Sequence, residues 1–283
     1  MTFIVVNFIF IILIFLISAV IARILIPRIL LISLRKKLFD IPDDRKVHKR
    51  AIPRLGGVSF FPTTLFAFCL VYTFRLLGGD SVSTLYASYL LPELLLFACG
   101  MTLLYLTGIA DDLVGVRYRQ KFVIQIFCAC LFPLSGLWIN DLYGLFGIHE
   151  LSVYVGIPFT ILTVVFITNA INLIDGIDGL ASGLSSVALL IFTFLFIEKG
   201  LWSYAMLAAG TFGVLVPFFY YNVFGSVERA RKIFMGDTGS LTLGYTLSFL
   251  AIKYSQHNAD IMPYTEGAFI IAFSTMILSL IHI

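Results

Sequence analysis

Charged residues are scarce in this sequence of 283 residues, since Asp, Glu, Lys and Arg together make up only 12% of it. In soluble domains these four residue types account for about a quarter of the chain. Hydrophobic residues make up 60% of the sequence, and its mean hydropathy is +1.01. This composition excludes an ordinary soluble domain and indicates that the protein resides in the lipid bilayer. No nucleic-acid partner is expected.

Cysteine and histidine are also few, with four of each. The cysteines all fall in apolar segments, where a thiol behaves as a small hydrophobic group, so they indicate neither a disulfide framework nor a metal site. The sequence has no serine-nucleophile motif, and its histidines are scattered. A covalent nucleophile is therefore not indicated. The cysteines are Cys69, Cys99, Cys128 and Cys130.

Apolar runs long enough to cross about 30 Å of hydrocarbon recur along nearly the whole chain. We therefore predict an all-α fold, a polytopic transmembrane helix bundle of about nine helices that forms a single domain over residues 1–283. The first run has no basic residue before it and no cleavage pattern, so we expect it to be retained. The predicted spans are 3–22, 56–78, 94–110, 121–139, 151–173, 180–197, 201–222, 239–255 and 265–283.

The basic residues are distributed unequally between the two sides of this bundle. Alternate loops place 14 of the 19 on one side, which the positive-inside rule assigns to the cytoplasm. We therefore predict that the N-terminus lies outside. The 14 residues are Arg35, Lys36, Lys37, Arg45, Lys46, Lys49, Arg50, Arg54, Arg117, Arg119, Lys121, Arg229, Arg231 and Lys232.

Acidic residues form three clusters at predicted helix ends on the same cytoplasmic side, although the topology was argued from the basic residues alone. They are the pair Asp111 and Asp112, the segment NAINLIDGIDGLASG with Asn169, Asn172, Asp175 and Asp178, and Asp237 in FMGDTGSLTLGY. Ionised carboxylates crowded at an apolar boundary repel one another and lose hydration, so such a cluster requires a cation.

Carboxylate and amide oxygens are ligands suited to Mg²⁺ or Mn²⁺, and Mg²⁺ commonly joins one or two carboxylates to the phosphates of a substrate. Lys121, Arg117 and Arg119 follow the Asp pair closely and add positive charge for a phosphate. A diphosphate substrate is therefore expected. The neighbouring glycines have two interpretations, since they either admit a ligand close to the backbone or pack helices together.

Four segments, in order along the chain, resemble motifs of the polyprenyl-phosphate N-acetylhexosamine-1-phosphate transferases, which begin lipid-linked glycan synthesis. The segments are DDRKVHKRAIPRLGG, GIADDLVGVRYRQKFVIQ, NAINLIDGIDGLASG and FMGDTGSLTLGY. The resemblance implies direct attack of undecaprenyl phosphate on the β-phosphate of a UDP-N-acetylhexosamine, UDP-N-acetylglucosamine being favoured. UMP would leave, and a lipid-linked diphosphate sugar would remain.

The resemblance also implies a role for each matching residue. Asp237 would be a Mg²⁺ ligand, Asp111 and Asp112 would handle the lipid phosphate with Asp111 as candidate base, and Lys121 would hold phosphate. The nucleotide-sugar site would include Lys49, Asn172, Asp175 and Asp178. The protein would be a multi-pass protein of the cytoplasmic membrane with its active site on the cytoplasmic face, and a homodimer is compatible with this.

Members of this family usually have ten or eleven transmembrane helices and a histidine-rich cytoplasmic motif in a late loop, whereas this sequence ends at LIHI. We therefore expect that the C-terminal part of the family domain is missing here. Two alternatives stay open. One is an ion-coupled transporter, whose carboxylates should lie near mid-membrane. The other is a catalytically silent member that keeps only the fold.

Overall fold

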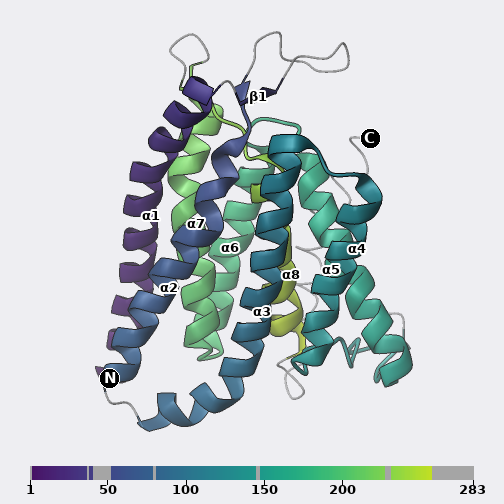
Figure 1. Ribbon diagram of the computed structural model, residues 1–283. Helices are drawn as coiled ribbons and strands as arrows, with labels where there is room; N and C mark the ends of the chain where they lie inside the picture. The colour runs from purple at the N-terminus through teal and green to yellow at the C-terminus, as the bar shows by residue number, and fades with distance from the viewer. Residues whose placement is uncertain are drawn as a thin grey trace.

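A computed structural model describes residues 2–36, 38–40, 52–78, 81–144, 147–226 and 231–256 as a bundle of long, roughly parallel and antiparallel helices (Figure 1). A short antiparallel ladder, in which Phe39 faces Pro53 and Asp40 faces Ile52, joins two strands at one end of it. The elements are α1 (Thr2–Lys36), β1 (Phe39–Asp40), β2 (Ile52–Pro53), η1 (Leu55–Ser59), α2 (Phe60–Leu77), α3 (Ser81–Val114), α4 (Tyr118–Leu134), α5 (Val153–Ile174), α6 (Leu180–Glu198), α7 (Trp202–Val223) and α8 (Gly236–Gln256).

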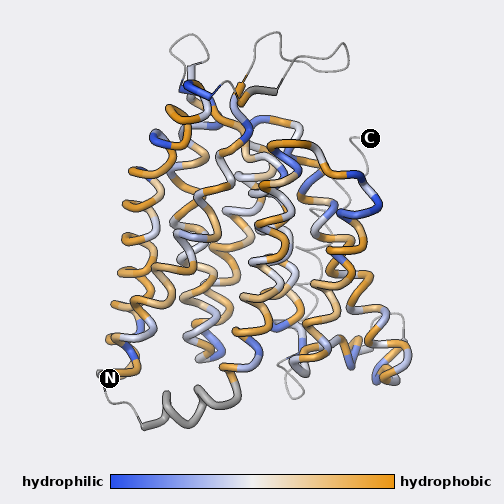
Figure 2. The backbone as a smooth tube through the Cα atoms, viewed as in Figure 1, coloured by the Kyte–Doolittle hydropathy of each residue, from blue (hydrophilic) through white to orange (hydrophobic). Residues whose placement is uncertain are grey.

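The outer helices present apolar side chains to their surroundings along most of their length. On α1, for example, Ile9, Ile12 and Val20 are each more than half exposed. Figure 2 shows hydrophobic residues along the bodies of the helices and hydrophilic residues gathered toward their ends. This distribution is the one that a hydrocarbon slab selects, and it confirms the predicted all-α, multi-pass membrane bundle.

Helix α8 lies inside the bundle and packs against α3 and α5. It is rich in Gly, Ser and Thr, and nearly all of its residues are buried. Several of its hydroxyl groups form hydrogen bonds within the helix, since Thr242, Thr246 and Ser248 each donate to the carbonyl four residues earlier at 2.7–2.8 Å. Small residues let neighbouring helices approach closely; Gly244, for instance, faces the backbone of Thr168 on α5.

Two of the predicted spans, 121–139 and 239–255, form helices that do not meet the length and composition expected of a membrane-spanning helix. Within the described part of the chain, six helices are long and apolar enough to cross a membrane, and α4 and α8 are not among them. The reasons differ, because α4 has only 17 residues, whereas α8 is long enough but carries many polar residues. A helix surrounded by other helices meets no lipid and therefore does not need an apolar exterior. The ninth predicted span, 265–283, lies outside the described residues.

The first helix extends well beyond its predicted end at residue 22, because α1 continues to Lys36. Arg23 and Arg28, which interrupt the apolar run in the sequence, therefore lie within the helix. The guanidinium of Arg23 lies 5.2 Å and 5.3 Å from the ring centroids of Tyr220 and Tyr221 on α7. Such cation–π contacts accommodate a charge on a helix face, so the arginine does not end the helix.

An ion pair joins α3 to α8 at the end of the bundle away from the strands. Lys253 Nζ donates to Glu93 Oε2 at 2.7 Å, and the same ammonium group lies 5.0 Å from the ring centroid of Tyr204. Glu93 is only 7% exposed. Removing one partner of such a pair leaves the other charge uncompensated in a poorly hydrated place.

We expect Glu93→Leu to lower the free energy of unfolding by about 2 kcal/mol or more. This is less than for a fully buried ion pair, because Lys253 is partly exposed. The double variant Glu93→Leu/Lys253→Met should recover most of this loss, since neither charge remains. Thermal unfolding of the protein in detergent micelles checks both. Equal destabilisation by the single and double variants would show that lost packing, not the unpaired charge, is responsible.

Candidate active site

The acidic clusters come together because the helices that carry them alternate in direction. Asp111 and Asp112 lie in the last turn of α3, and Asp175 directly follows α5. Asp237 lies in the first turn of α8, which runs the opposite way. Ends of antiparallel helices meet at one level of a bundle, so carboxylates far apart in sequence lie at one end of the molecule (Figure 1).

Lys121, in the first turn of α4, links two of these carboxylates. Its Nζ donates to Asp111 Oδ2 at 2.9 Å and also to Asp237 Oδ1. The other oxygen of Asp111 accepts the backbone N–H of Val116 at 2.7 Å, within the turn that joins α3 to α4. The three side chains are 14–25% exposed, so they are largely buried but reachable from outside.

Asn172, in the last turn of α5, contacts the same oxygen of Asp237. Its Nδ2 donates to Asp237 Oδ1 at 2.5 Å and lies 2.7 Å from Ser240 Oγ. Asp237 Oδ1 therefore accepts from an ammonium group on α4 and an amide on α5. Both donors orient the carboxylate.

Asp112 has a different environment, because its carboxylate caps the N-terminus of α8. It accepts the backbone N–H groups of Asp237 at 2.8 Å and Thr238 at 3.0 Å, and the Thr238 hydroxyl at 2.6 Å. An anion at a helix N-terminus satisfies donors that have no intrahelical partner and interacts favourably with the helix dipole. Gly236 precedes this turn with φ +73°, and a Cβ there would clash with the carbonyl of Arg54 and with Asp112.

Asp175 is the carboxylate least compensated in this end of the bundle. Burial is the first cause that raises its pKa well above the ordinary value, and the negative charges of Asp237 and Asp112 raise it further. The backbone N–H of Gly236 and the positive charge of Arg54 act in the opposite direction. Because ionising Asp175 is unfavourable here, additional positive charge beside it would be stabilising.

Asp178 forms a second ion pair at this end of the molecule. Lys232 Nζ lies 2.5 Å from Asp178 Oδ2 and joins the loop before α6 to the segment before α8. Asn222, near the end of α7, reinforces this link, since its Oδ1 accepts the N–H of Gly179 at 2.7 Å and its Nδ2 donates to the carbonyl of Ile233 at 3.0 Å. Both segments that flank the acidic cluster are thereby fixed to α7.

Comparison with known proteins identifies the family of this chain. The sequence model of glycosyl transferase family 4 matches residues 94–255, which include Asp111, Asp112, Asp175, Asp178 and Asp237. The chain belongs to glycosyl transferase family 4.

Curated relatives of this family 4 member are transferases that act on undecaprenyl phosphate. A probable undecaprenyl-phosphate N-acetylglucosaminyl 1-phosphate transferase of Bacillus subtilis is 32% identical over 222 residues, which are 78% of this chain and 56% of the relative. Undecaprenyl-phosphate α-N-acetylglucosaminyl 1-phosphate transferases of Yersinia pestis and Escherichia coli are 30% and 28% identical, each match covering 87% of this chain and 63% of the relative. The family 4 chain thus spans about three fifths of the length of these relatives.

The donor set of the family 4 site suits the predicted Mg²⁺. Asp111 and Asp237 already direct one oxygen each toward a single cation, the Lys121 ammonium. Within the described ranges no group of three or more His, Cys, Asp or Glu side chains is arranged to hold a metal on its own. Mg²⁺ bound through one or two carboxylates completes its shell with substrate phosphate oxygens and water, so these residues fit it.

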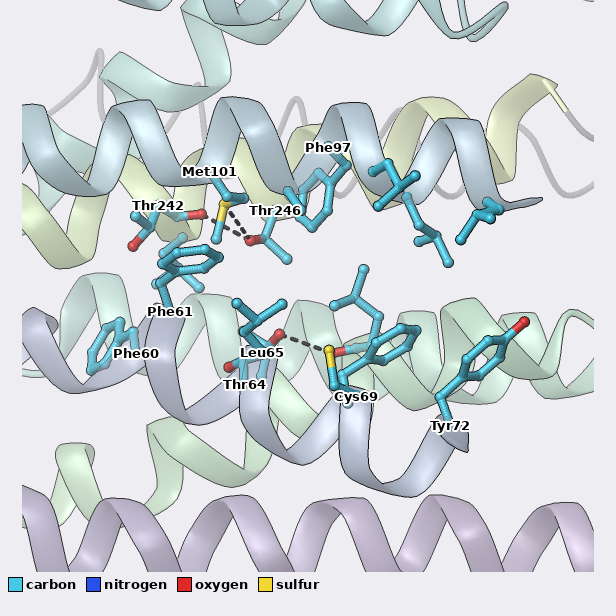
Figure 3. A pocket seen from close by; sticks show the side chains of 18 of the residues that line it. Phe60, Phe61, Thr64, Leu65, Cys69, Tyr72, Phe97, Met101, Thr242 and Thr246 are labelled. Carbon is cyan, nitrogen blue, oxygen red and sulfur yellow. Dashed lines mark hydrogen bonds between the residues drawn. The ribbon is translucent and has the colours of Figure 1, made fainter. Parts of the chain in front are cut away.

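A separate cavity of about 230 Å³ lies between α2 and α3 and is lined almost entirely by apolar side chains. Figure 3 shows Phe61, Leu65 and Tyr72 on α2 facing Met101 and Phe97 on α3. Its lining contains no Asp, Glu, Lys or Arg. This cavity lacks the charges that a phosphate requires, so it is not a candidate for a phosphate site.

The structure brings most of the predicted site residues to one end. Asp111, Lys121, Asn172 and Asp237 are in contact, Asp112 contacts the backbone of Asp237, and Asp175 is influenced by Asp237 and Asp112. Asp178 pairs with a cation elsewhere on the same end. Lys49 lies outside the described residues. Asp111, Asp175 and Asp237 lie at or next to helix ends, whereas the transporter alternative predicts carboxylates near the middle of the spans.

Sequence reasoning missed three residues that hold the site together, namely Asn222, Lys232 and Thr238. Lys232 was counted only as a marker of topology, and Asn222 lies in the apolar run of α7. A polar residue near the end of a membrane helix was the available signal for Asn222. The glycines near the acidic residues had two interpretations, and Gly244 illustrates the packing one, since a Cβ there would overlap the backbone of Thr168.

We expect Asp112→Asn to lower the stability by about 1–2 kcal/mol, because an amide nitrogen would face the N–H of Thr238 where an oxygen now accepts it. For a chain of this size the apparent unfolding temperature should fall by a few degrees. Asp141→Asn is the matched control, since Asp141 Oδ1 accepts only the N–H of Tyr143 in a distant turn and an amide oxygen can replace it. An unchanged unfolding temperature for Asp112→Asn would contradict the capping role.

Proposed function

We propose that this protein is a glycosyl-1-phosphate transferase that moves N-acetylhexosamine 1-phosphate from a UDP-sugar to undecaprenyl phosphate and releases UMP. The observation that carries the proposal is the convergence of Lys121 and Asn172 on Asp237 beside Asp111, at one end of a membrane bundle. The names of the curated relatives support the lipid acceptor and the N-acetylglucosamine 1-phosphate group.

In the proposed reaction an oxygen of the lipid phosphate attacks the β-phosphorus of the UDP-sugar. A new P–O bond forms to the lipid phosphate, while the bond from the β-phosphorus to the bridging oxygen breaks, and UMP leaves with that oxygen. Such a transfer depends mainly on alignment and on neutralising charge at the phosphoryl group. An apolar bundle with its charges at one end suits it, because the lipid tail can stay in the bilayer while its phosphate reaches the site.

The side chains have distinct proposed roles. Lys121 binds phosphate through its ammonium group, and its present contacts with Asp111 and Asp237 hold it in place for this. Asp111, kept ionised by Lys121, accepts the proton of a lipid phosphate that arrives monoprotonated. Asp112 sets the position of Asp237 by capping α8 and contributes to the lipid-phosphate side of the site.

Asp237 would hold Mg²⁺, or Mn²⁺ in its place, and the ion would neutralise charge on the diphosphate. Asn172 keeps the Asp237 carboxylate oriented for this role. The nucleotide-sugar is assigned to the side of Asp175 and Asp178, and Lys49 is assigned to the same ligand from the basic segment. Because Asp175 is insufficiently compensated by its protein surroundings, bound positive charge would stabilise its ionised form.

The proposed setting follows from the charge distribution. The described basic residues Arg35 and Lys36 end α1 at the same end of the bundle as the acidic site. We assign this end to the cytoplasmic face of the cell membrane, with the N-terminus outside, on the positive-inside rule. Residues 1–283 are assigned to one transferase domain, and the product would initiate a cell-envelope glycan.

Membranes that contain this protein should form a lipid-linked N-acetylglucosamine diphosphate from UDP-N-acetylglucosamine only when undecaprenyl phosphate and Mg²⁺ are both present. Lys121→Gln should lower the initial rate about 100-fold or more, because one charged donor to the reacting phosphates is removed. Radiolabelled sugar in the lipid fraction and released UMP are measured together. Lys199→Gln, the same change at the opposite end of α6, should leave the rate unchanged.

A wild-type protein that is folded but yields no lipid-linked product would identify it as the catalytically silent member and would overturn the proposal. Product formed without added or endogenous lipid phosphate would exclude the proposed acceptor.

Asp237→Asn should raise the Mg²⁺ concentration that gives half-maximal rate by about tenfold or more, since an anionic oxygen ligand becomes neutral. Mg²⁺ titration of the transfer rate measures this, and Asp141→Asn is the control at the opposite end. A metal titration identical to that of the wild type would refute Asp237 as a metal ligand.

A further inference from the structure

Two amide side chains, Gln125 on α4 and Asn169 on α5, form a reciprocal pair between these helices. Asn169 Nδ2 donates to Gln125 Oε1 at 2.6 Å, and Gln125 Nε2 donates to Asn169 Oδ1 at 3.3 Å. Asn169 Nδ2 also donates to the carbonyl of Val165 at 2.8 Å. Gln125 is only 2% exposed. Gln125 thus lies in the interior and Asn169 is partly buried, although neither residue has been given a part in the proposed reaction.

The pair lies one helical turn from the candidate active site on both helices. Gln125 follows Lys121 by four residues on α4, and Asn169 precedes Asn172 by three on α5. Residues three or four apart share one face of a helix. Lys121 and Asn172 both donate to Asp237 Oδ1. The amide pair thus joins α4 to α5 one turn away from Lys121 and Asn172, the two donors to this oxygen.

A reciprocal amide pair fixes the register of two helices in a way that apolar packing does not. Hydrophobic contact is non-directional, so apolar faces tolerate small displacements along the helix axis. A hydrogen bond is lost by a donor–acceptor distance of about 3.6 Å, whereas a shift by one residue moves a helix by about 1.5 Å. Because α4 packs on α3 and α5, its height against α5 decides where Lys121 lies.

We propose that Gln125 and Asn169 are positioning residues that set the register of α4 against α5 and so hold Lys121 and Asn172 on the same oxygen of Asp237. The consequence for the transfer rate rests on the proposed function, whereas the consequence for Lys121 does not. Interhelical hydrogen bonds between amides add little stability in membranes, because released groups find other partners within the bundle. Loss of the pair therefore affects the site more than the fold.

The decisive variant is Gln125→Leu/Asn169→Leu, which removes both amides and leaves no unpaired polar group. We expect kcat to fall about tenfold or more, because small displacements of positioning groups are costly in rate. The KM for UDP-N-acetylglucosamine should change less than about threefold, and the unfolding temperature in detergent should stay within a few degrees of the wild type. Wild-type kcat in this variant would overturn the proposal.

Reversing the two side chains tests register directly. Gln125→Asn/Asn169→Gln keeps the same two amides and the same total length between the helices, so it should restore kcat to within about threefold of the wild type. A reversed pair as slow as the double leucine variant would overturn the proposal. Thr160→Val is the control on α5, since it removes an acceptor for the N–H of Ile139 remote from the site, and it should leave kcat unchanged.

A second measurement does not depend on activity. Acetylation of Lys121 by acetic anhydride, followed by mass spectrometry and referred to Lys199, should be slow in the wild type, where the Lys121 side chain is 15% exposed and ion-paired. It should become about fivefold faster or more in the double leucine variant and return to slow in the reversed pair. An unchanged rate in the double leucine variant refutes the register role, even in a protein whose proposed transferase activity has failed to appear.

Discussion

Four carboxylates meet at one end of an apolar bundle, and the electrostatic cost of holding their charges there is the constraint to which the surrounding structure responds. The carboxylates do not all have the same source of compensation. Lys121 bridges Asp111 and Asp237, while backbone N–H groups at the N-terminus of α8 donate to Asp112. Asp175 retains a raised pKa because burial and its acidic neighbours outweigh its compensating contacts. Residual negative potential of this kind is what a site for a cation and a phosphorylated substrate needs.

The position of α8 makes this concentration of charge possible. A helix that begins with Gly-Asp-Thr-Gly presents backbone N–H groups at its start, and its small residues let it lie inside the bundle. Close approach is needed on two sides, at Gly108 on α3 and at Gly244 of α8 itself, where side chains would overlap neighbouring backbone. The helix that is least apolar in the bundle is therefore also the one that places Asp237 at the centre of the site.

The polar links outside the acidic cluster share a common function. Asn222 fixes the loop before α6 and the segment before α8, and the Gln125–Asn169 pair joins α4 to α5. Each contact relates two segments that carry residues of the site. In a membrane, apolar packing brings helices together, whereas directional hydrogen bonds decide their relative heights. The proposed reaction depends on the alignment of two phosphates, and such alignment needs both apolar packing and directional hydrogen bonds.

The sequence by itself determined the membrane class, the positions of most helices and the acidic residues of the site, because hydrophobic length and the cost of membrane carboxylates act locally. It placed the ends of α5, α6 and α7 within two residues, yet it ended α1 at residue 22, since a single arginine resembles a boundary when Tyr220 and Tyr221 are not in view. Only the tertiary structure decided that Asp112 caps α8, that Lys121 joins α3 to α8, and that Lys232 pairs with Asp178. Apart from the Lys121–Asp111 contact, those contacts join residues separated by 54 to 126 positions, and their existence depends on helix directions and heights that no local pattern encodes.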